Sequence, residues 1–287
     1  MLSIVVTWRD RVELAEALAS IIDSASAVGG DVTVVNFGGS PEMLATLLGV
    51  RAAEVNVVEV ARQRFFNKSC AQNVGAARTT HPVLFFCDCD IILDPESVRH
   101  LAGEVATRPG IFATLAGVTE SELNSRGGRH IASFGYELRI RTADGRTLKI
   151  VDNEEDADDG TRQAPGLLFL RRTDFLAVNG YNSRLHGWGW EDQDMISRLT
   201  LGAGLERVSL GRAVHISHDD ASRIGNYPPV TDRWESRDRM FRQALANYDN
   251  NDFRGTFDAD IKSVAARGTS ALDGSRARVL LQTKATR

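Results

Sequence analysis

The sequence predicts an α/β fold in which a mostly parallel central sheet is flanked by helices. In the first third of the 287 residues, short apolar runs rich in β-branched side chains alternate with segments of helical apolar spacing. Strands that alternate with helices in this way are typical of βαβ units and a parallel sheet. Because ligands of such sheets bind beyond the carboxyl ends of the strands, the residues that follow each strand are the first candidates for a site.

The regular part extends to residue 90. Apolar side chains recur at Leu14, Leu18 and Ile21 in the first predicted helix, and Ser40-Pro41 is a typical start for the second. The predicted strands are 3–8, 31–37, 54–60 and 82–90, and the predicted helices between them are 11–25, 41–48 and 67–79.

The remainder is less regular. We expect strands at 111–118 and 131–140, a strand followed by a short helix within 164–180, a strand within 207–220 and a helix at 231–247. The segment 151–160 carries six carboxylates in ten residues, which favours a solvated loop because like charges repel. From about residue 265 the pattern is weak, which predicts a partly disordered tail.

Composition narrows the class of protein. The chain is 43% hydrophobic and 25% charged, as in ordinary soluble proteins, and its net charge of −4 gives it no general attraction to nucleic acid or anionic membranes. No apolar run approaches the ~20 residues of a membrane span, and the start lacks signal-peptide features, so we expect a cytoplasmic protein. Cys70, Cys87 and Cys89 fit no zinc or disulfide pattern and are expected to be reduced thiols.

Two groups of side chains suit a metal ion. Asp88 and Asp90 follow an apolar strand at i and i+2, and carboxylate oxygens bind Mg²⁺ or Mn²⁺; the alternative is a strand that ends in turn-forming acids. His215 and His218 close another strand, where they are either metal ligands or structural residues. Imidazole beside carboxylate favours Mn²⁺ over Mg²⁺.

The segment "LHGWGWEDQDMISRL" (185–199) gathers tryptophans and acids at the start of a predicted helix. It is either a capped helix start with aromatic packing or a site that binds a polar ligand through Trp188, Glu191 and Asp192. Arg9, Arg11 and Lys68 lie near the predicted ligand face, where they either bind phosphate or are surface cations. Phe66 is either a core residue or a contact for a nucleobase.

Several motifs, taken in order, resemble those of nucleotide-sugar glycosyltransferases of the GT-A fold. They are "TWRDR", "FNKSCAQNVG", "DCD", "NGYNSRLHGWGWEDQD" and "HISH". The resemblance covers roughly residues 1–220 and is to the β-1,4-galactosyltransferase type and to bacterial family 2-like enzymes. It implies a GT-A catalytic domain at 1–220, with a nucleotide-binding half at 1–95 and an acceptor and metal half at 96–220. Residues 221–287 would then form a helical extension with a partly flexible tail.

The resemblance also implies roles for single residues. It implies a UDP-sugar donor, Mn²⁺ or Mg²⁺ as cofactor, and a carbohydrate or small-molecule acceptor. The Glu-Asp pair of the signature implies inversion at the anomeric carbon, with Asp192 as the base and Glu191 beside it. The implied donor contacts are Thr7, Trp8, Arg9, Arg11, Phe66, Lys68, Asp88 and Trp188, and the implied metal ligands are Asp90, His218 and His215.

Two positions depart from the family pattern. Trp190 replaces the usual second glycine of the signature, which adds a bulky ring beside the acids, and His215 replaces a methionine of some relatives. Two other functions remain as alternatives. A nucleotidyltransferase or sugar pyrophosphorylase would need a glycine-rich loop after the first strand, which "TWRDR" does not provide. A non-catalytic nucleotide-sugar-binding module would not need the acids and histidines together.

Overall fold

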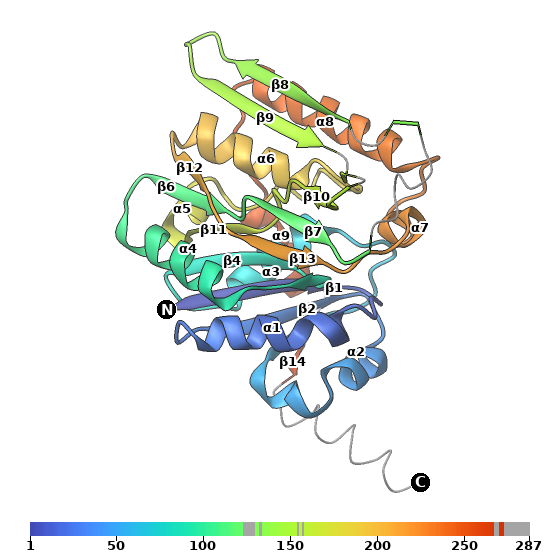
Figure 1. Cartoon of the computed structure of the whole chain (residues 1–287). Helices are drawn as coiled ribbons and strands as arrows, with labels where there is room; N and C mark the ends of the chain where they lie inside the picture. The colour runs from blue at the N-terminus through green and yellow to red at the C-terminus, as the bar shows by residue number, and fades with distance from the viewer. Residues whose placement is uncertain (123–129, 132–133, 154, 157, 267–269, 273–287) are drawn as a thin grey trace, which may run out of the picture.

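An eight-stranded sheet forms the centre of the molecule (Figure 1). The computed structural model describes residues 1–122, 130–131, 134–153, 155–156, 158–266 and 270–272. Six strands run in one direction, and β11 and β14 run against them. The order across the sheet is β12 (Glu206–Ser209), β6 (Ile111–Thr114), β11 (Leu168–Arg171), β4 (Val83–Asp88), β1 (Leu2–Trp8), β2 (Asp31–Phe37), β3 (Asn56–Val60) and β14 (Ser270–Leu272). The predicted mostly parallel α/β fold is confirmed.

Helices cover both faces of this sheet because its strands are apolar on both sides. In β1, Ile4 and Val6 belong to one core and Val5 to the other, as the two-residue period of a strand requires. The first core is closed by α1 (Leu14–Ser26), α2 (Pro41–Leu48) and α4 (Pro95–Thr107). The second is closed by α3 (Lys68–Ala77), α5 (Arg172–Ala177), α6 (Glu191–Ser197), α8 (Arg233–Asp249) and α9 (Phe257–Ala266).

A smaller sheet brings together segments that are distant in sequence. Its order is β10 (Thr161–Arg162), β7 (Gly117–Glu120), β13 (Arg212–His215) and β5 (Ile91–Ile92). In its register His215 lies between Glu120 of β7 and Ile91 of β5. Asp90 directly precedes β5, so this sheet assembles an aspartate, a glutamate and a histidine from three parts of the chain.

Two further elements complete the described structure. A hairpin of β8 (Gly135–Arg141) and β9 (Thr147–Asn153) lies beside α8 (Figure 1), and Arg237 of α8 is paired with Asp152 of the hairpin. The short helix α7 (Asp220–Ile224) leads from β13 toward α8. None of the helices in the described residues is long and apolar enough to span a membrane.

The element boundaries differ from the prediction at three places. The 3-10 helix η1 (Gly49–Glu54) shortens the predicted strand 54–60. The predicted strand 82–90 ends at Asp88, and the predicted strand 111–118 is divided between β6 and β7, which belong to different sheets. Of the predicted strand 131–140, residues 132–133 lie outside the described part. The predicted tail disorder from about residue 265 falls largely on residues outside it as well.

Three helices, α4, α7 and α9 (Phe257–Ala266), were not predicted. The start of α4 carries standard signals, since Asp94 accepts hydrogen bonds from the Glu96 and Ser97 amides and Pro95 occupies the first turn. The helix α9 packs against α3, close to the middle of the fold.

Candidate active site

A cavity of about 830 Å³ opens where β1, β4 and β13 end. It is lined by every candidate donor-binding, metal-binding and catalytic residue of the sequence analysis except Trp8. These lining residues are Thr7, Arg9, Arg11, Phe66, Lys68, Asp88, Asp90, Trp188, Glu191, Asp192, His215 and His218. The sequence therefore predicts most of one convergent site, assembled from segments that lie up to about two hundred residues apart.

Trp8 is the exception among the predicted donor contacts. Its side chain is fully buried in the core on the α1 side, and its indole Nε1 donates a hydrogen bond of 2.7 Å to the Arg11 carbonyl. Because the ring is out of reach of a ligand, the structure gives Trp8 the task of holding the loop that carries Arg9 and Arg11.

Asp90, His215 and His218 form one group of potential metal ligands, with one ligand atom of each within 4.8 Å of the others. His218 Nε2 lies 3.1 Å and His215 Nε2 3.6 Å from Asp90 Oδ2. The second nitrogen of each ring is already engaged, His215 Nδ1 with Glu120 Oε2 at 2.7 Å and His218 Nδ1 with the Asp219 carbonyl at 3.2 Å.

This group fits a divalent ion. Asp90 Oδ1 is buried and has no hydrogen-bond partner among the described residues, so it is available as a ligand. Burial raises the pKa of Asp90, but its contacts with His215, His218 and Arg11 outweigh this and hold the pKa well below the ordinary value. A charged carboxylate with two imidazoles is a donor set that suits Mn²⁺.

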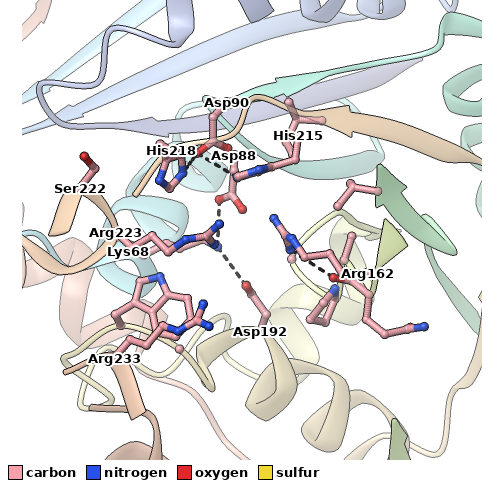
Figure 2. Close-up of a pocket in the computed structure, with 18 of the residues that line it drawn as sticks. Lys68, Asp88, Asp90, Arg162, Asp192, His215, His218, Ser222, Arg223 and Arg233 are labelled. Atoms are coloured by element: carbon pink, nitrogen blue, oxygen red, sulfur yellow. Dashed lines mark hydrogen bonds and ion pairs between the residues drawn. The ribbon is translucent and has the colours of Figure 1, made fainter. Parts of the chain in front are cut away.

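Asp88 points to a different partner. The sequence predicts both acids on one side of an extended chain, but β4 ends at Asp88 and the chain turns before Asp90. Asp88 Oδ1 pairs with Lys68 Nζ at 2.9 Å and is not part of the group formed by Asp90 and the histidines. Asp88 and Asp90 therefore lie in the same cavity with separate contacts (Figure 2).

Lys68 is the centre of an acidic cluster. It is the first residue of α3, whose start is capped by Asn67. Its Nζ lies 2.9 Å from Asp88, 2.9 Å from Asp192 and 3.5 Å from Glu191. Burial lowers the pKa of Lys68, but the surrounding carboxylates, Asp192 first, outweigh burial and raise the pKa well above its ordinary value. Lys68 is therefore charged.

The acids Glu191 and Asp192 begin helix α6. Burial, followed by repulsion from Asp192, raises the pKa of Glu191 to about 8. Burial also raises the pKa of Asp192, against the opposing effect of Lys68. Asp192 Oδ2 accepts a hydrogen bond from Lys68, whereas Oδ1 is buried without a partner among the described residues. One oxygen of Asp192 is thus available for a ligand.

The tryptophans beside these acids differ in their surroundings. Trp188 is half-buried and lines the cavity, with the Arg233 guanidinium 5.9 Å from its ring. Trp190 precedes α6 with φ of 68°, a left-handed conformation that glycine, the residue the resemblance leads one to expect here, adopts without strain. It is buried against Phe241 at a ring distance of 4.6 Å, and it also lines the cavity.

Several lining residues were not predicted. Glu120 ends a strand that the sequence prediction stops two residues earlier, and Arg162 pairs with it. Asp152 and Glu155 come from the segment expected to be a solvated loop, yet both line the cavity. Others come from α7, α8 and the segment between them: Ser222, Arg223, Asn226, Tyr227, Arg233, Trp234 and Arg237. None of these residues belongs to a recognisable sequence motif, so their convergence on the cavity becomes visible only in the folded structure.

Exposed aromatic side chains gather at one edge of this cavity. All aromatic residues lie in the described part of the chain, and the most exposed are Phe134, Tyr136 and Trp234, at 39%, 43% and 39%. Phe134 and Trp234 line the cavity with ring centroids 6.3 Å apart. The Arg237 guanidinium lies 5.4 Å from the Tyr136 ring and 5.6 Å from the Trp234 ring. We call Phe134, Tyr136 and Trp234 the aromatic rim.

Residues 154–219 match the sequence model of a family described as the N-terminal domain of galactosyltransferase. This segment of the chain is therefore similar to part of a galactosyltransferase. The matched part is less than a quarter of the chain, but it includes Trp188, Glu191, Asp192, His215 and His218. The resemblance to galactosyltransferases expected from the sequence is confirmed. No curated protein gives a significant match.

Two solved structures are similar to this chain in arrangement. One is a Drosophila β-1,4-galactosyltransferase 7 mutant in complex with manganese, UDP-Gal and xylobiose, at 15% identity and a TM-score of 0.43, covering 82% of this chain and 79% of that one. The other is TarS of S. aureus, at 15% identity and a TM-score of 0.48, covering 75% and 60%. Likenesses this distant carry no information about substrate.

Proposed function

We propose that the protein is a metal-dependent inverting glycosyltransferase that moves a hexose or N-acetylhexosamine from a UDP-sugar to a hydroxyl acceptor. One observation carries the proposal. Asp192, whose Oδ1 is buried and has no hydrogen-bond partner among the described residues, lies in the same cavity as the potential ligand group Asp90, His215 and His218 (Figure 2). A base and a site for leaving-group charge are the two requirements of direct sugar transfer.

Asp90, His215 and His218 would hold the ion. A bound Mn²⁺ stabilises the negative charge that develops on a departing diphosphate. Arg9 supports the same task, because its Nε and Nη1 groups are buried with no hydrogen-bond partner among the described residues. Arg11 lies 3.3 Å from Asp90 and would serve beside Arg9 as a cation for the diphosphate.

Phe66 and Tyr227 support a nucleotide in this cavity. Their rings meet edge to face at 5.4 Å, and both line the wall next to Arg9. An apolar aromatic wall beside unpartnered guanidinium donors suits a nucleobase followed by phosphates.

Asp192 would remove the proton from the acceptor hydroxyl. Its Oδ2 is held by Lys68, which favours the charged carboxylate, and its free Oδ1 can accept the proton. A carboxylate on the side opposite the leaving group leads to direct displacement and inversion. Glu191, whose pKa is raised to about 8, is protonated at neutral pH and can donate a hydrogen bond to a sugar oxygen.

The aromatic rim supports a carbohydrate acceptor. Flat rings bind the apolar face of a pyranose, and water-exposed aromatic side chains at a cavity edge are otherwise costly. Trp188 is half-buried and lines the same cavity as Asp192 and the rim residues Phe134 and Trp234, so it offers a further aromatic face to an acceptor.

The proposal is tested by donor binding and turnover. We expect a UDP-sugar with Mn²⁺ at a hundred times its dissociation constant to stabilise the fold by about 2.7 kcal/mol, and EDTA to abolish UDP release. Asp192→Asn is expected to retain the thermal shift and to lose transfer by at least about 100-fold, because the amide cannot accept the proton. Asp23→Asn, on the surface of α1, is the matched control.

Two results would contradict this assignment. If no UDP-sugar shifts the melting temperature, the donor is wrong. Full transfer activity of the Asp192→Asn variant would show that Asp192 is not the base. Formation of pyrophosphate from a nucleoside triphosphate and a sugar phosphate would instead identify a pyrophosphorylase.

A further inference from the structure

Glu120 is a buried carboxylate that the proposed reaction does not use. It is the last residue of β7, and its side chain is 1% exposed. Its Oε2 accepts hydrogen bonds from His215 Nδ1 at 2.7 Å and from Ser217 Oγ at 2.9 Å, and its Oε1 accepts one from Arg162 Nε. A charge buried this deeply is costly unless it is paired and hydrogen-bonded. The contacts with His215, Ser217 and Arg162 satisfy this requirement for Glu120.

The backbone fixes Glu120 against His215. The two residues are register partners in the parallel pair of β7 and β13. The pairing continues beyond them, because the Ser121 amide donates to the His215 carbonyl at 2.8 Å and the Ser217 amide donates to Ser121 Oγ at 3.0 Å. The contact between carboxylate and imidazole is therefore set by the sheet rather than by a flexible side chain.

This contact selects the tautomer of His215. A charged carboxylate only accepts hydrogen bonds, so the imidazole must carry a proton on Nδ1. Nε2 of a neutral imidazole then holds its lone pair toward Asp90, 3.6 Å away. His218 reaches the same orientation with a weaker acceptor, the Asp219 carbonyl. A carboxylate behind a ligating imidazole orients the ring and increases its strength as a ligand.

We infer that Glu120, held in place by Arg162, is the positioning residue that orients His215 for the metal ion. The inference rests on the proposed function, since it concerns the same site. Glu120 does not contact substrate or ion in this scheme. It acts through His215 alone. Its effect on metal affinity should therefore depend on His215, whereas a general effect of its negative charge would not.

The test measures Mn²⁺ affinity of the full chain by titration calorimetry without any donor, so that turnover is not involved. We expect Glu120→Gln to weaken Mn²⁺ binding about 10- to 100-fold, the usual range for loss of such a partner. In a His215→Ala background the same substitution is expected to change the affinity less than about threefold, because the residue that Glu120 orients is gone. Glu122→Gln, which removes the same charge from the cavity wall, is the control.

The outcomes separate the inference from the proposed function. Wild-type protein that binds no Mn²⁺ contradicts the metal dependence itself. Wild-type binding that Glu120→Gln leaves unchanged, equal losses in both backgrounds, or an equal loss in Glu122→Gln overturns the role of Glu120.

A second measurement needs no variant. In the metal-free wild-type protein, at a pH high enough that the imidazoles are neutral, nitrogen NMR is expected to show His215 protonated on Nδ1, because the tautomer is then set by Glu120 and not by an ion. A proton on Nε2 overturns the inference, even where Glu120→Gln fails to fold.

Discussion

A single ammonium group faces three carboxylates in the wall of the cavity. Lys68 lies 2.9 Å from both Asp88 and Asp192, but 3.5 Å from Glu191. Asp88 is 36% exposed and is solvated by water, whereas Glu191, at 6%, depends on this one positive charge, which it shares with Asp88 and Asp192. The more distant Glu191, with its pKa raised to about 8, is therefore the acid that holds a proton at neutral pH. Asp192 keeps the direct contact with Lys68 and therefore the charge.

This arrangement predicts a pH dependence of stability. Because the pKa of Glu191 is about 8 in the folded protein and lower when unfolded, the folded state holds the proton more tightly. The stabilisation is complete below the unfolded pKa and is lost as the pH rises through 8. The free energy of unfolding is thus expected to fall between pH 5 and 9, by at most about 1.4 kcal/mol per pH unit.

Urea unfolding at several pH values checks this. Glu191→Gln resembles the protonated acid, so its stability is expected to fall less steeply over the same window. Glu16→Gln, an exposed substitution on α1, should keep the wild-type slope. Parallel curves for the wild type and Glu191→Gln would show that Glu191 does not titrate there.

Side chains at the ends of apolar runs were predictable from sequence, whereas Glu120, which the pairing of β7 and β13 places beside His215, was not. Asp90 and His218 follow apolar runs that are visible as letters, and their convergence follows from the geometry of parallel sheets. Trp8 also follows such a run, but a side chain at a strand end faces either the core or the site, and the sequence does not say which. The sequence likewise does not show that Trp190 adopts a left-handed conformation. A left-handed residue costs about 1–2 kcal/mol, and burial of an indole, worth about 3–5 kcal/mol, outweighs it.

At the scale of elements, the division of the predicted strand 111–118 into β6 and β7 places Glu120 in the site. The Leu115 amide bonds to Leu167 and the Ala116 amide to Gly211, so the chain leaves the large sheet and enters the small one within two residues. Both segments are apolar, and periodicity alone cannot show the crossing. Glu120 reaches His215 only because of this crossing, which explains why sequence reasoning missed it.

Helix α8 and the hairpin of β8 and β9 together form the aromatic rim. Trp234 of α8 is 39% exposed, and its ring faces Phe134 and the guanidinium of Arg237. We expect Trp234→Ala to reduce transfer to oligosaccharide acceptors about fivefold to tenfold, since loss of one stacked ring costs about 1 kcal/mol. Hydrolysis of the donor without an acceptor is expected to be unchanged.

The measurement compares the rate of transfer to the acceptor with the rate of donor hydrolysis in each variant. Trp234→Phe keeps a ring at the same position and is expected to restore most of the transfer. An equal loss of hydrolysis and transfer in Trp234→Ala would mean that the rim supports the whole cavity rather than the acceptor.

At the scale of the whole molecule, the predicted boundary at residue 220 crosses the site. Seven residues between 222 and 237 line the same cavity as Thr7 and Lys68, and α9 packs against α3 in the second core. The division into a domain at 1–220 and an extension remains a prediction from resemblance. The contacts indicate that the helices after residue 220 complete the cavity wall.

Asp260 of α9 ties these late helices to the first half of the chain. It is 8% exposed and accepts hydrogen bonds from Asn73 Nδ2 at 2.7 Å, Ser183 Oγ at 2.7 Å and Thr256 Oγ1 at 2.8 Å. Asn73, which is fully buried in α3, also bonds the backbone of Tyr181. Three segments from different thirds of the chain therefore meet at one carboxylate.

Asp260→Ala is expected to lower the free energy of unfolding by roughly 2–4 kcal/mol, because it removes the carboxylate that accepts from the buried amide of Asn73 and from two hydroxyls, and that of Ser183 has no other acceptor among the described residues. Urea unfolding measures this loss directly. Asp258→Ala, an exposed aspartate one half-turn earlier on α9, is the matched control and is expected to change stability by less than about 0.5 kcal/mol. If the two variants are equally stable, α9 is not held to α3 through Asp260, and the helices after residue 220 behave as an addition to the fold rather than as a part of it.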